Sequence, residues 1–125
     1  MILLDTNIII DYLKKPDEEM TDILNDNDIA VCGVVEAELI HGARSEKEID
    51  LIKDAISCFE MLSYSNNWEI LGRMLNKLRA NGLTLPFADV IIAQIAIEHD
   101  VCVLSRDGHF KKIKEIFPRL RLFGE

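Results

Sequence analysis

Long hydrophobic runs are missing from this 125-residue sequence. No stretch reaches the roughly 18 apolar residues that a membrane-spanning helix requires, and the first residues lack the basic segment and long apolar core of a signal peptide. Internal repeats, linkers and low-complexity segments are missing too. With a hydrophobic content of 49%, we expect a soluble, cytoplasmic protein that forms a single domain over residues 1–125.

Cysteine is scarce, and its distribution excludes two common uses. Cys32, Cys58 and Cys102 are odd in number, lie far apart and form no C-x-x-C pair. This spacing argues against disulfides and zinc ligation. We expect three buried thiols.

Basic residues are in the minority, because 14 Lys and Arg face 22 Asp and Glu and leave a net charge of −8. Such a balance argues against a nucleic-acid partner, since phosphate binding depends on Lys and Arg. The acids are concentrated in residues 17–60, however, which hold thirteen acids and three bases, whereas residues 61–125 hold seven acids and nine bases. Divalent cations bound by carboxylates would offset part of the negative charge locally. An acidic total therefore does not exclude RNA.

Short apolar strands alternate with amphipathic helices along the chain. The predicted strands cover residues 2–4, 29–31, 61–62, 101–104 and 120–123. The predicted helices cover residues 8–13, 17–24, 34–43, 46–60, 68–80, 86–97 and 111–116. The helix at 86–97 is apolar nearly all round, which is typical of a helix buried on every side. This alternation predicts an α/β fold with a parallel, doubly wound sheet.

Some local details of these elements are also predicted. Thr6 or Asn7 is expected to cap the first helix. Ala37 and Ile40 are expected on one side of the helix at 34–43, and Gly42 at its end.

Four acids occupy special positions in this pattern. Asp5 follows the first strand, Asp107 follows the strand at 101–104, Asp89 lies in the first turn of the buried helix, and Glu38 lies inside an apolar helix. The carboxyl ends of parallel strands line one crevice, so these acids are expected to converge. Clustered carboxylates repel one another unless a cation is present, and oxygen ligands suit Mg²⁺ or Mn²⁺.

Each acid also has a simpler explanation. Asp5 is a candidate helix N-cap, and Asp89 is favoured by the helix dipole in a first turn. Glu38 is explained equally well by an exposed position, with Glu36 close by, and Asp107 by a turn before Gly108. Independent capping does not predict all four together, which favours metal-assisted phosphodiester chemistry.

The four acidic segments resemble the motifs of PIN-domain ribonucleases. These segments are Leu4-Asp5-Thr6-Asn7, Glu38-Leu39 with Gly42, Ala88-Asp89 with Ile92-Ala93, and Leu104-Ser105-Arg106-Asp107 with His109-Phe110. Their order and spacing match across essentially the whole chain. The small size and the last segment are most similar to VapC toxins of toxin–antitoxin pairs.

The resemblance implies a three-layer α/β/α PIN-like fold, with a short parallel sheet flanked by helices. It also implies a Mg²⁺-dependent endoribonuclease, inhibited by a cognate antitoxin and often homodimeric, that cuts tRNA, rRNA or mRNA and leaves a 5′-phosphate. By position, Asp5, Glu38, Asp89 and Asp107 would be the catalytic, metal-binding acids. Asn7 and Ser105 would be their polar supports. The family often has small hydroxyl residues before the second acid, where this chain has Cys32 and Val35.

Contacts with RNA phosphates are the other proposed role. The candidates are Lys111, Lys112, Lys114, Arg106 and His109. A solvated surface is the alternative explanation for the basic residues, and a turn position is the alternative for His109.

Two other functions compete with the nuclease. A haloacid-dehalogenase-like phosphatase needs a second Asp two residues after the first, where this chain has Asn7, and a receiver domain needs paired acids after the first strand. A non-catalytic PIN-like binding domain would not need all four acids. The phosphatase-like hydrolase and the binding domain remain alternatives to the nuclease.

Overall fold

Five parallel strands form one sheet in the order β3-β2-β1-β4-β5. A computed structural model describes all residues from Met1 to Glu125. The strands are β1 (Ile2–Leu4), β2 (Ile29–Cys32), β3 (Glu60–Leu62), β4 (Cys102–Leu104) and β5 (Arg121–Leu122). Strands β1 and β2 are buried along their whole length, as expected of parallel strands covered on both faces.

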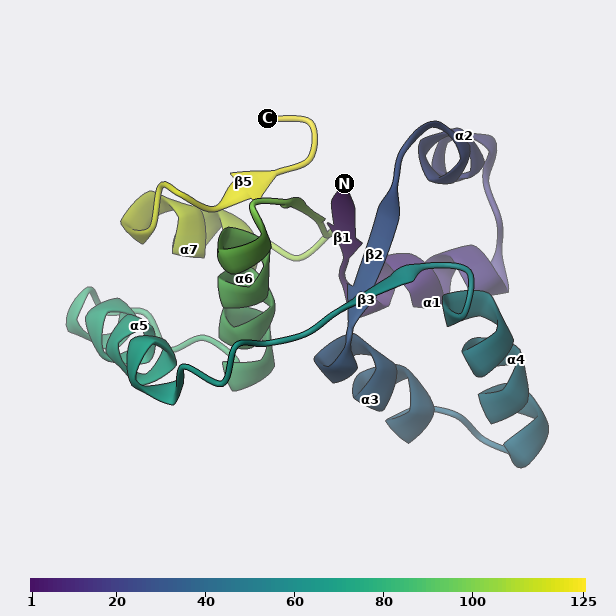
Figure 1. The fold of residues 1–125 in the computed structure, drawn as a ribbon, viewed down its shortest axis with the longest axis horizontal. Helices are drawn as coiled ribbons and strands as arrows, with labels where there is room; N and C mark the ends of the chain where they lie inside the picture. The colour runs from purple at the N-terminus through teal and green to yellow at the C-terminus, as the bar shows by residue number, and fades with distance from the viewer.

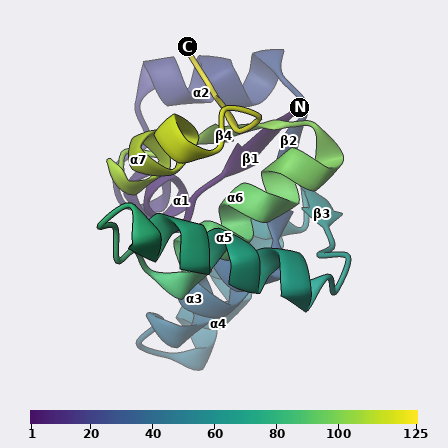
Figure 2. The same ribbon diagram turned by 90° about the vertical axis from the view of Figure 1, so that its left-hand side faces the viewer.

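Seven helices flank the sheet. They are α1 (Thr6–Lys14), α2 (Glu18–Asp26), α3 (Gly33–His41), α4 (Glu46–Ile56), α5 (Trp68–Ala80), α6 (Phe87–His99) and α7 (His109–Ile116). Helices α5, α6 and α7 lie on one side of the strands, and α1, α2 and α4 lie on the other (Figures 1 and 2), while α3 extends from the carboxyl end of β2. The predicted three-layer α/β/α fold is confirmed. No helix combines the length and the apolar character needed to cross a membrane.

The direction of strand addition reverses between β1 and β4. The chain builds β1, β2 and β3 outward in one direction, and then returns through α5 and α6 to place β4 on the other side of β1. Leu4 pairs with Leu104 in this register. The residues that follow these two strands therefore emerge side by side at the carboxyl edge of the sheet.

Helix α6 is the buried helix that the sequence predicts. Every residue from Asp89 to Ala96 is buried, and the helix contributes to an apolar core of 29 residues. Its two ends are exposed, with Phe87 at 55% exposure at the start and Glu98 and His99 at the end. Asp89 is thus the acid at the buried start of an otherwise apolar helix.

The structure corrects several local predictions. Asp5, and not Thr6 or Asn7, caps α1. Helix α3 buries Val35 and Leu39, which lie one turn apart, whereas Ala37 is exposed on the opposite side because it lies halfway between them. Gly42 does end this helix.

Other predicted boundaries and burials also shift. The predicted helix at 46–60 ends at Ile56, because Glu60 already belongs to β3. Helix α7 begins at His109, two residues before its predicted start, and β5 contains only Arg121 and Leu122. Cys32 is buried, but Cys58 is exposed and Cys102 is only partly buried, so the expectation of three buried thiols is wrong for these two.

Candidate functional site

Asp5 and Ser105 begin the candidate site, at the point where the strand order reverses. Asp5 directly follows β1 and Ser105 directly follows β4, and the Asp5 N–H donates to the Leu104 carbonyl at 3.0 Å. In open α/β sheets, ligands bind in the crevice at such a reversal, outside the carboxyl ends of the strands. The two residues lie side by side where such a crevice is expected.

Both carboxylate oxygens of Asp5 are engaged. Oδ1 accepts a 2.8 Å hydrogen bond from the Thr6 N–H, which makes Asp5 the N-cap of α1. Oδ2 accepts a 2.6 Å hydrogen bond from the Ser105 hydroxyl. The cap and the candidate ligand are therefore the same residue, with only 4% of its surface exposed.

Glu38 joins the site through the neighbouring threonine. The Thr6 hydroxyl donates to Oε1 of Glu38 at 2.8 Å, so a residue of α3 is tied to the first turn of α1. Thr6 is buried, whereas Glu38 itself is exposed. Glu36 makes no hydrogen bond to any of these residues, and the Glu38 assignment therefore fits the structure better.

Asp107 is held by the loop between β4 and α7. Its N–H donates to the Ser105 hydroxyl oxygen at 2.9 Å, and its Oδ1 accepts from the His109 N–H at 3.0 Å. The Ser105 hydroxyl thus donates to Asp5 and accepts from Asp107. One serine orients two of the acids.

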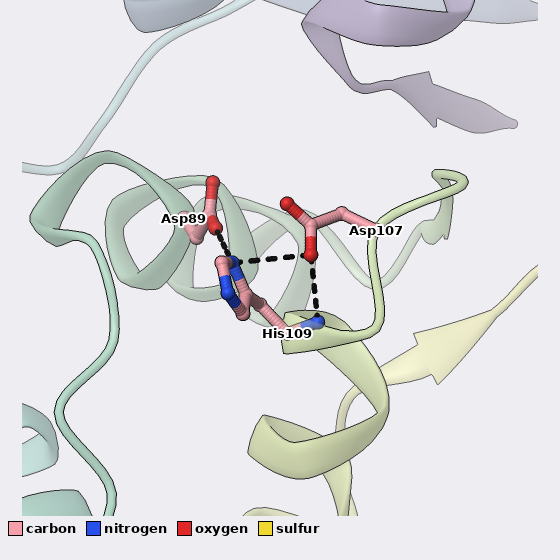
Figure 3. A group of neighbouring side chains, drawn as sticks. All are labelled: Asp89, Asp107 and His109. Carbon is pink, nitrogen blue, oxygen red and sulfur yellow. Dashed lines mark hydrogen bonds and ion pairs between the residues drawn. The ribbon is translucent and has the colours of Figure 1, made fainter.

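His109 joins the last two acids. Its Nδ1 lies 2.7 Å from Oδ2 of Asp89 and 3.1 Å from Oδ1 of Asp107 (Figure 3). The three side chains come from the start of α6, the β4–α7 loop and the start of α7, and their possible ligand atoms all lie within 4.8 Å of one another. Sequence reasoning placed His109 near the site as a possible phosphate contact but did not predict this bridge. Its position two residues after Asp107 was the only signal.

The electrostatics of Asp89 reflect its burial and the other acids around it. Burial raises the pKa of the Asp89 carboxyl, and the nearby charges of Asp5 and Asp107 raise this pKa further. The hydrogen bond and charge of His109 oppose the rise. An added cation would stabilise the ionised carboxylate.

Cys32 faces the same acids from the end of β2. Burial raises the pKa of its thiol, with a smaller rise from Asp5 and Glu38. The thiol therefore stays protonated near neutral pH and is a poor nucleophile. The site offers no activated cysteine.

The predicted supports and RNA contacts differ in the partners that they have in the structure. Asn7 is exposed and makes no hydrogen bond to Asp5, so of the two predicted supports only Ser105 contacts this acid. Arg106 pairs with Asp11 and also lies 4.0 Å from Asp17. The Lys114 ammonium donates to the Leu120 carbonyl at 2.6 Å.

Lys111 and Lys112 are the basic candidates that remain available. Both are exposed, and neither makes an ion pair or a side-chain hydrogen bond within the chain. Lys111 lines a small cavity together with Ser105 and Asp107. Of the five predicted RNA contacts, these two lysines are therefore the best placed to meet a phosphate.

An apolar groove of about 280 Å³ has none of the acids in its lining. It is formed by the end of β1, by α1 and α2, and by the end of α4 with the residues that follow it, and all ten residues that line it are hydrophobic. Leu13, at 45% exposure, lies in this groove together with the exposed Cys58. Its lining presents almost no polar surface to a ligand.

Comparison with known proteins shows what the chain resembles. Residues 2–116 match the model of the PIN domain. Ribonuclease VapC17 of Mycobacterium tuberculosis is 27% identical over 95 residues, which are 73% of this chain and 71% of that protein.

Solved structures show the same similarity in three dimensions. A structure of VapBC2 from Rickettsia felis, bound to a DNA fragment from its promoter, matches with a TM-score of 0.82 at 26% identity and covers 98% of this chain and 97% of that one. DNA-bound VapBC from Salmonella typhimurium matches with a TM-score of 0.83 at 26% identity, covering 97% and 95%.

Proposed function

The chain belongs to the PIN-domain family and is VapC-like, and from this premise we propose that it is a metal-dependent endoribonuclease, the toxin of a toxin–antitoxin pair. The observation that carries the proposal is a hydrogen-bonded network that links four acids from four segments of the chain. It runs from Glu38 through Thr6 to Asp5, then through Ser105 to Asp107, and through His109 to Asp89. Helix capping alone does not require this convergence.

The donor set fits a hard divalent cation. Asp5, Glu38, Asp89 and Asp107 would hold Mg²⁺, or Mn²⁺, through carboxylate oxygens, and the raised pKa of Asp89 fits a cluster that a cation would stabilise. When bound, such an ion activates a water molecule for attack on phosphorus and stabilises charge on the leaving oxygen. No side-chain nucleophile is needed.

The other residues of the site orient these acids and receive the substrate. Ser105 would orient the carboxylate of Asp5 and the backbone of Asp107, and Thr6 would orient the carboxylate of Glu38. Lys111 and Lys112 would contact RNA phosphates beside Asp107. If water attacks and the 3′ oxygen leaves, the products carry a 5′-phosphate and a 3′-hydroxyl.

A cleavage assay tests the enzyme proposal. The purified protein should cut one or more members of a tRNA, rRNA and mRNA panel with Mg²⁺, and EDTA should stop the reaction. Glu38→Gln should lower the rate roughly a hundredfold or more, whereas the matched control Glu36→Gln, on the same helix, should leave it unchanged. Products that end in a 2′,3′-cyclic phosphate would exclude the water mechanism.

The same assay separates the alternatives. Cleavage of a small phosphate monoester, with RNA left intact, would favour a phosphatase-like hydrolase. A folded protein that binds RNA but cuts neither substrate would favour a non-catalytic PIN-like domain.

We further propose that an antitoxin occupies the apolar groove of α1, α2 and α4. Its lining is entirely hydrophobic, which fits an apolar segment of a partner protein better than a polyanionic substrate. The similar structures from Rickettsia felis and Salmonella typhimurium are VapBC assemblies.

We also propose that two copies of the chain form a homodimer. Trp68 and Ile70 on α5 remain 55% and 41% exposed, and they are available for such a contact. Light scattering of the purified protein, with Trp68→Glu as the disrupting variant, tests this state.

A further inference from the structure

Resting on the proposed metal-dependent function, we propose that His109 is itself a metal ligand, so that this chain holds its ion with mixed nitrogen and oxygen donors. Asp89 and Asp107, whose ligand atoms lie within 4.8 Å of the ring nitrogen, would then share the ion with an imidazole. Such a donor set favours Mn²⁺ over Mg²⁺, because imidazole suits the transition metals whereas Mg²⁺ prefers oxygen ligands.

The ring of His109 faces two of the acids and makes no other polar contact within the protein. Nδ1 lies 2.7 Å from Asp89 and 3.1 Å from Asp107, and these are the only polar contacts of the side chain within the protein. Nε2 makes no hydrogen bond within the chain, and the side chain is 33% exposed. Nδ1 therefore has no polar partner within the protein other than these two carboxylates.

The backbone around His109 is held in place. Its N–H donates to Oδ1 of Asp107, and α7 is anchored in the core by Phe110 and Ile113, which are 1% and 0% exposed. The position of the imidazole is therefore constrained by both the loop and the helix. A rigid support of this kind is what a metal ligand requires.

The contacts of the ring are compatible with the site both with and without a bound cation. A neutral imidazole carries one N–H, and with the hydrogen on Nδ1 it donates to the carboxylates. With that hydrogen on the solvent-accessible Nε2 instead, the Nδ1 lone pair faces the same two oxygens. In that tautomer Nδ1 can serve as a donor atom for a cation.

Bound Mn²⁺ allows the ligand atoms to be identified by spectroscopy. We expect electron spin echo envelope modulation of Mn²⁺ bound to the tag-free protein to show coupling to a ¹⁴N nucleus. His109→Asp should remove this coupling while keeping an oxygen ligand. Calorimetric titration with each metal alone should show the ratio of Mn²⁺ to Mg²⁺ affinity falling about tenfold in this variant.

The other two histidines provide matched controls. His41 is exposed on α3, three residues after Glu38, and the His99 ring lies 2.8 Å from the Ser63 carbonyl. His41→Gln and His99→Gln should keep the ¹⁴N coupling and the affinity ratio. Loss of the coupling in His41→Gln instead would overturn the assignment.

A positioning role for His109 makes a different prediction. His109→Asn keeps a side-chain donor close to the position of Nδ1 but has no imidazole. If His109 only orients Asp89 and Asp107, this variant should keep the wild-type affinity ratio, and that result would overturn the proposal. Circular dichroism of both variants checks that they fold.

The outcomes separate this inference from the proposed function. Mn²⁺ binding with no ¹⁴N coupling in the wild type would overturn the role of His109 and leave the four-acid site intact. Absence of Mn²⁺ binding, with RNA cleavage insensitive to EDTA, would overturn both.

Discussion

The hydroxyl of Ser105 donates a 2.6 Å hydrogen bond to Oδ2 of Asp5, a residue 100 positions earlier in the chain. The same hydroxyl accepts the Asp107 N–H at 2.9 Å. A single oxygen atom therefore couples the end of β1 to the loop after β4, and it orients two of the acids of the proposed metal site.

Ser105→Ala should weaken the site without unfolding the protein. Because both Asp5 and Asp107 lose a partner, we expect RNA cleavage and Mg²⁺ affinity to fall by about tenfold to a hundredfold. The loss in unfolding free energy should be only about 1 kcal/mol. Cleavage rates and urea denaturation measure the two effects, and Ser105→Thr, which keeps the hydroxyl, should retain most of the activity.

Two substitutions of Asp5 should separate its two roles. Asn is as good an N-cap as Asp, so Asp5→Asn should remove cleavage with little loss of stability. Asp5→Ala should also remove cleavage but cost about 1 kcal/mol more in unfolding free energy. Equal stability of the two variants would show that the cap contributes nothing.

The raised pKa of Asp89 predicts a pH-dependent stability of the metal-free protein. This carboxyl binds a proton more readily in the folded state than in the unfolded state, where its pKa is about 3.9. Above that pH, loss of the proton costs more free energy in the folded state than in the unfolded state. The unfolding free energy should fall as pH rises from that value through the higher folded pKa. Below that window the penalty is absent.

Asp89→Asn should remove this dependence. Urea denaturation in EDTA, repeated at several pH values, should give a difference between wild type and variant that grows in favour of the variant as pH rises. A difference that stays constant across the window would contradict the prediction.

Exchange of Lys111 and Lys112 for Gln should weaken RNA binding in a salt-dependent way. Each lost phosphate contact on a single strand lowers the slope of log affinity against log salt by about 0.7, so the pair should lower it by about 1.4. Lys47→Gln with Lys53→Gln, on the remote helix α4, is the matched control. Equal slopes for the two double variants would remove the two lysines from the RNA contact.

Leu13→Glu should block the proposed antitoxin while leaving RNA cleavage intact. The variant places a charge in the apolar groove, and we expect at least tenfold weaker binding, about 1.4 kcal/mol, of the protein encoded by the neighbouring reading frame. Leu51→Glu is the control, because Leu51 is 58% exposed on α4 but lies outside the groove. Co-expression followed by calorimetry of the purified pair measures the difference.

The sequence predicted the fold well where hydrophobic patterning was strong. Strands β1 and β4 are continuous apolar segments and the buried helix α6 is apolar nearly all round, and the acids next to or within them follow from their positions. Weakly patterned segments were harder, as the exposed Ala37 and the two-residue strand β5 illustrate.

The candidate site could also be predicted from the sequence only in part. The four acids could be selected from the sequence, because each lies beside a recognisable strand or inside an apolar helix. The bridge from His109 to Asp89 could not, because it depends on how α6 packs against α7 and on which side of its turn the ring lies. The link from Thr6 to Glu38 likewise depends on the placement of α3 beside α1.

The reversal of strand order between β1 and β4 has a consequence for synthesis. The ribosome makes Asp5 first, but the serine and the loop that hold this acid in place come 100 residues later. A growing chain that stops before residue 105 carries three of the four acids and lacks the parts that join them. The proposed metal site can therefore form only after nearly all of the chain has been translated.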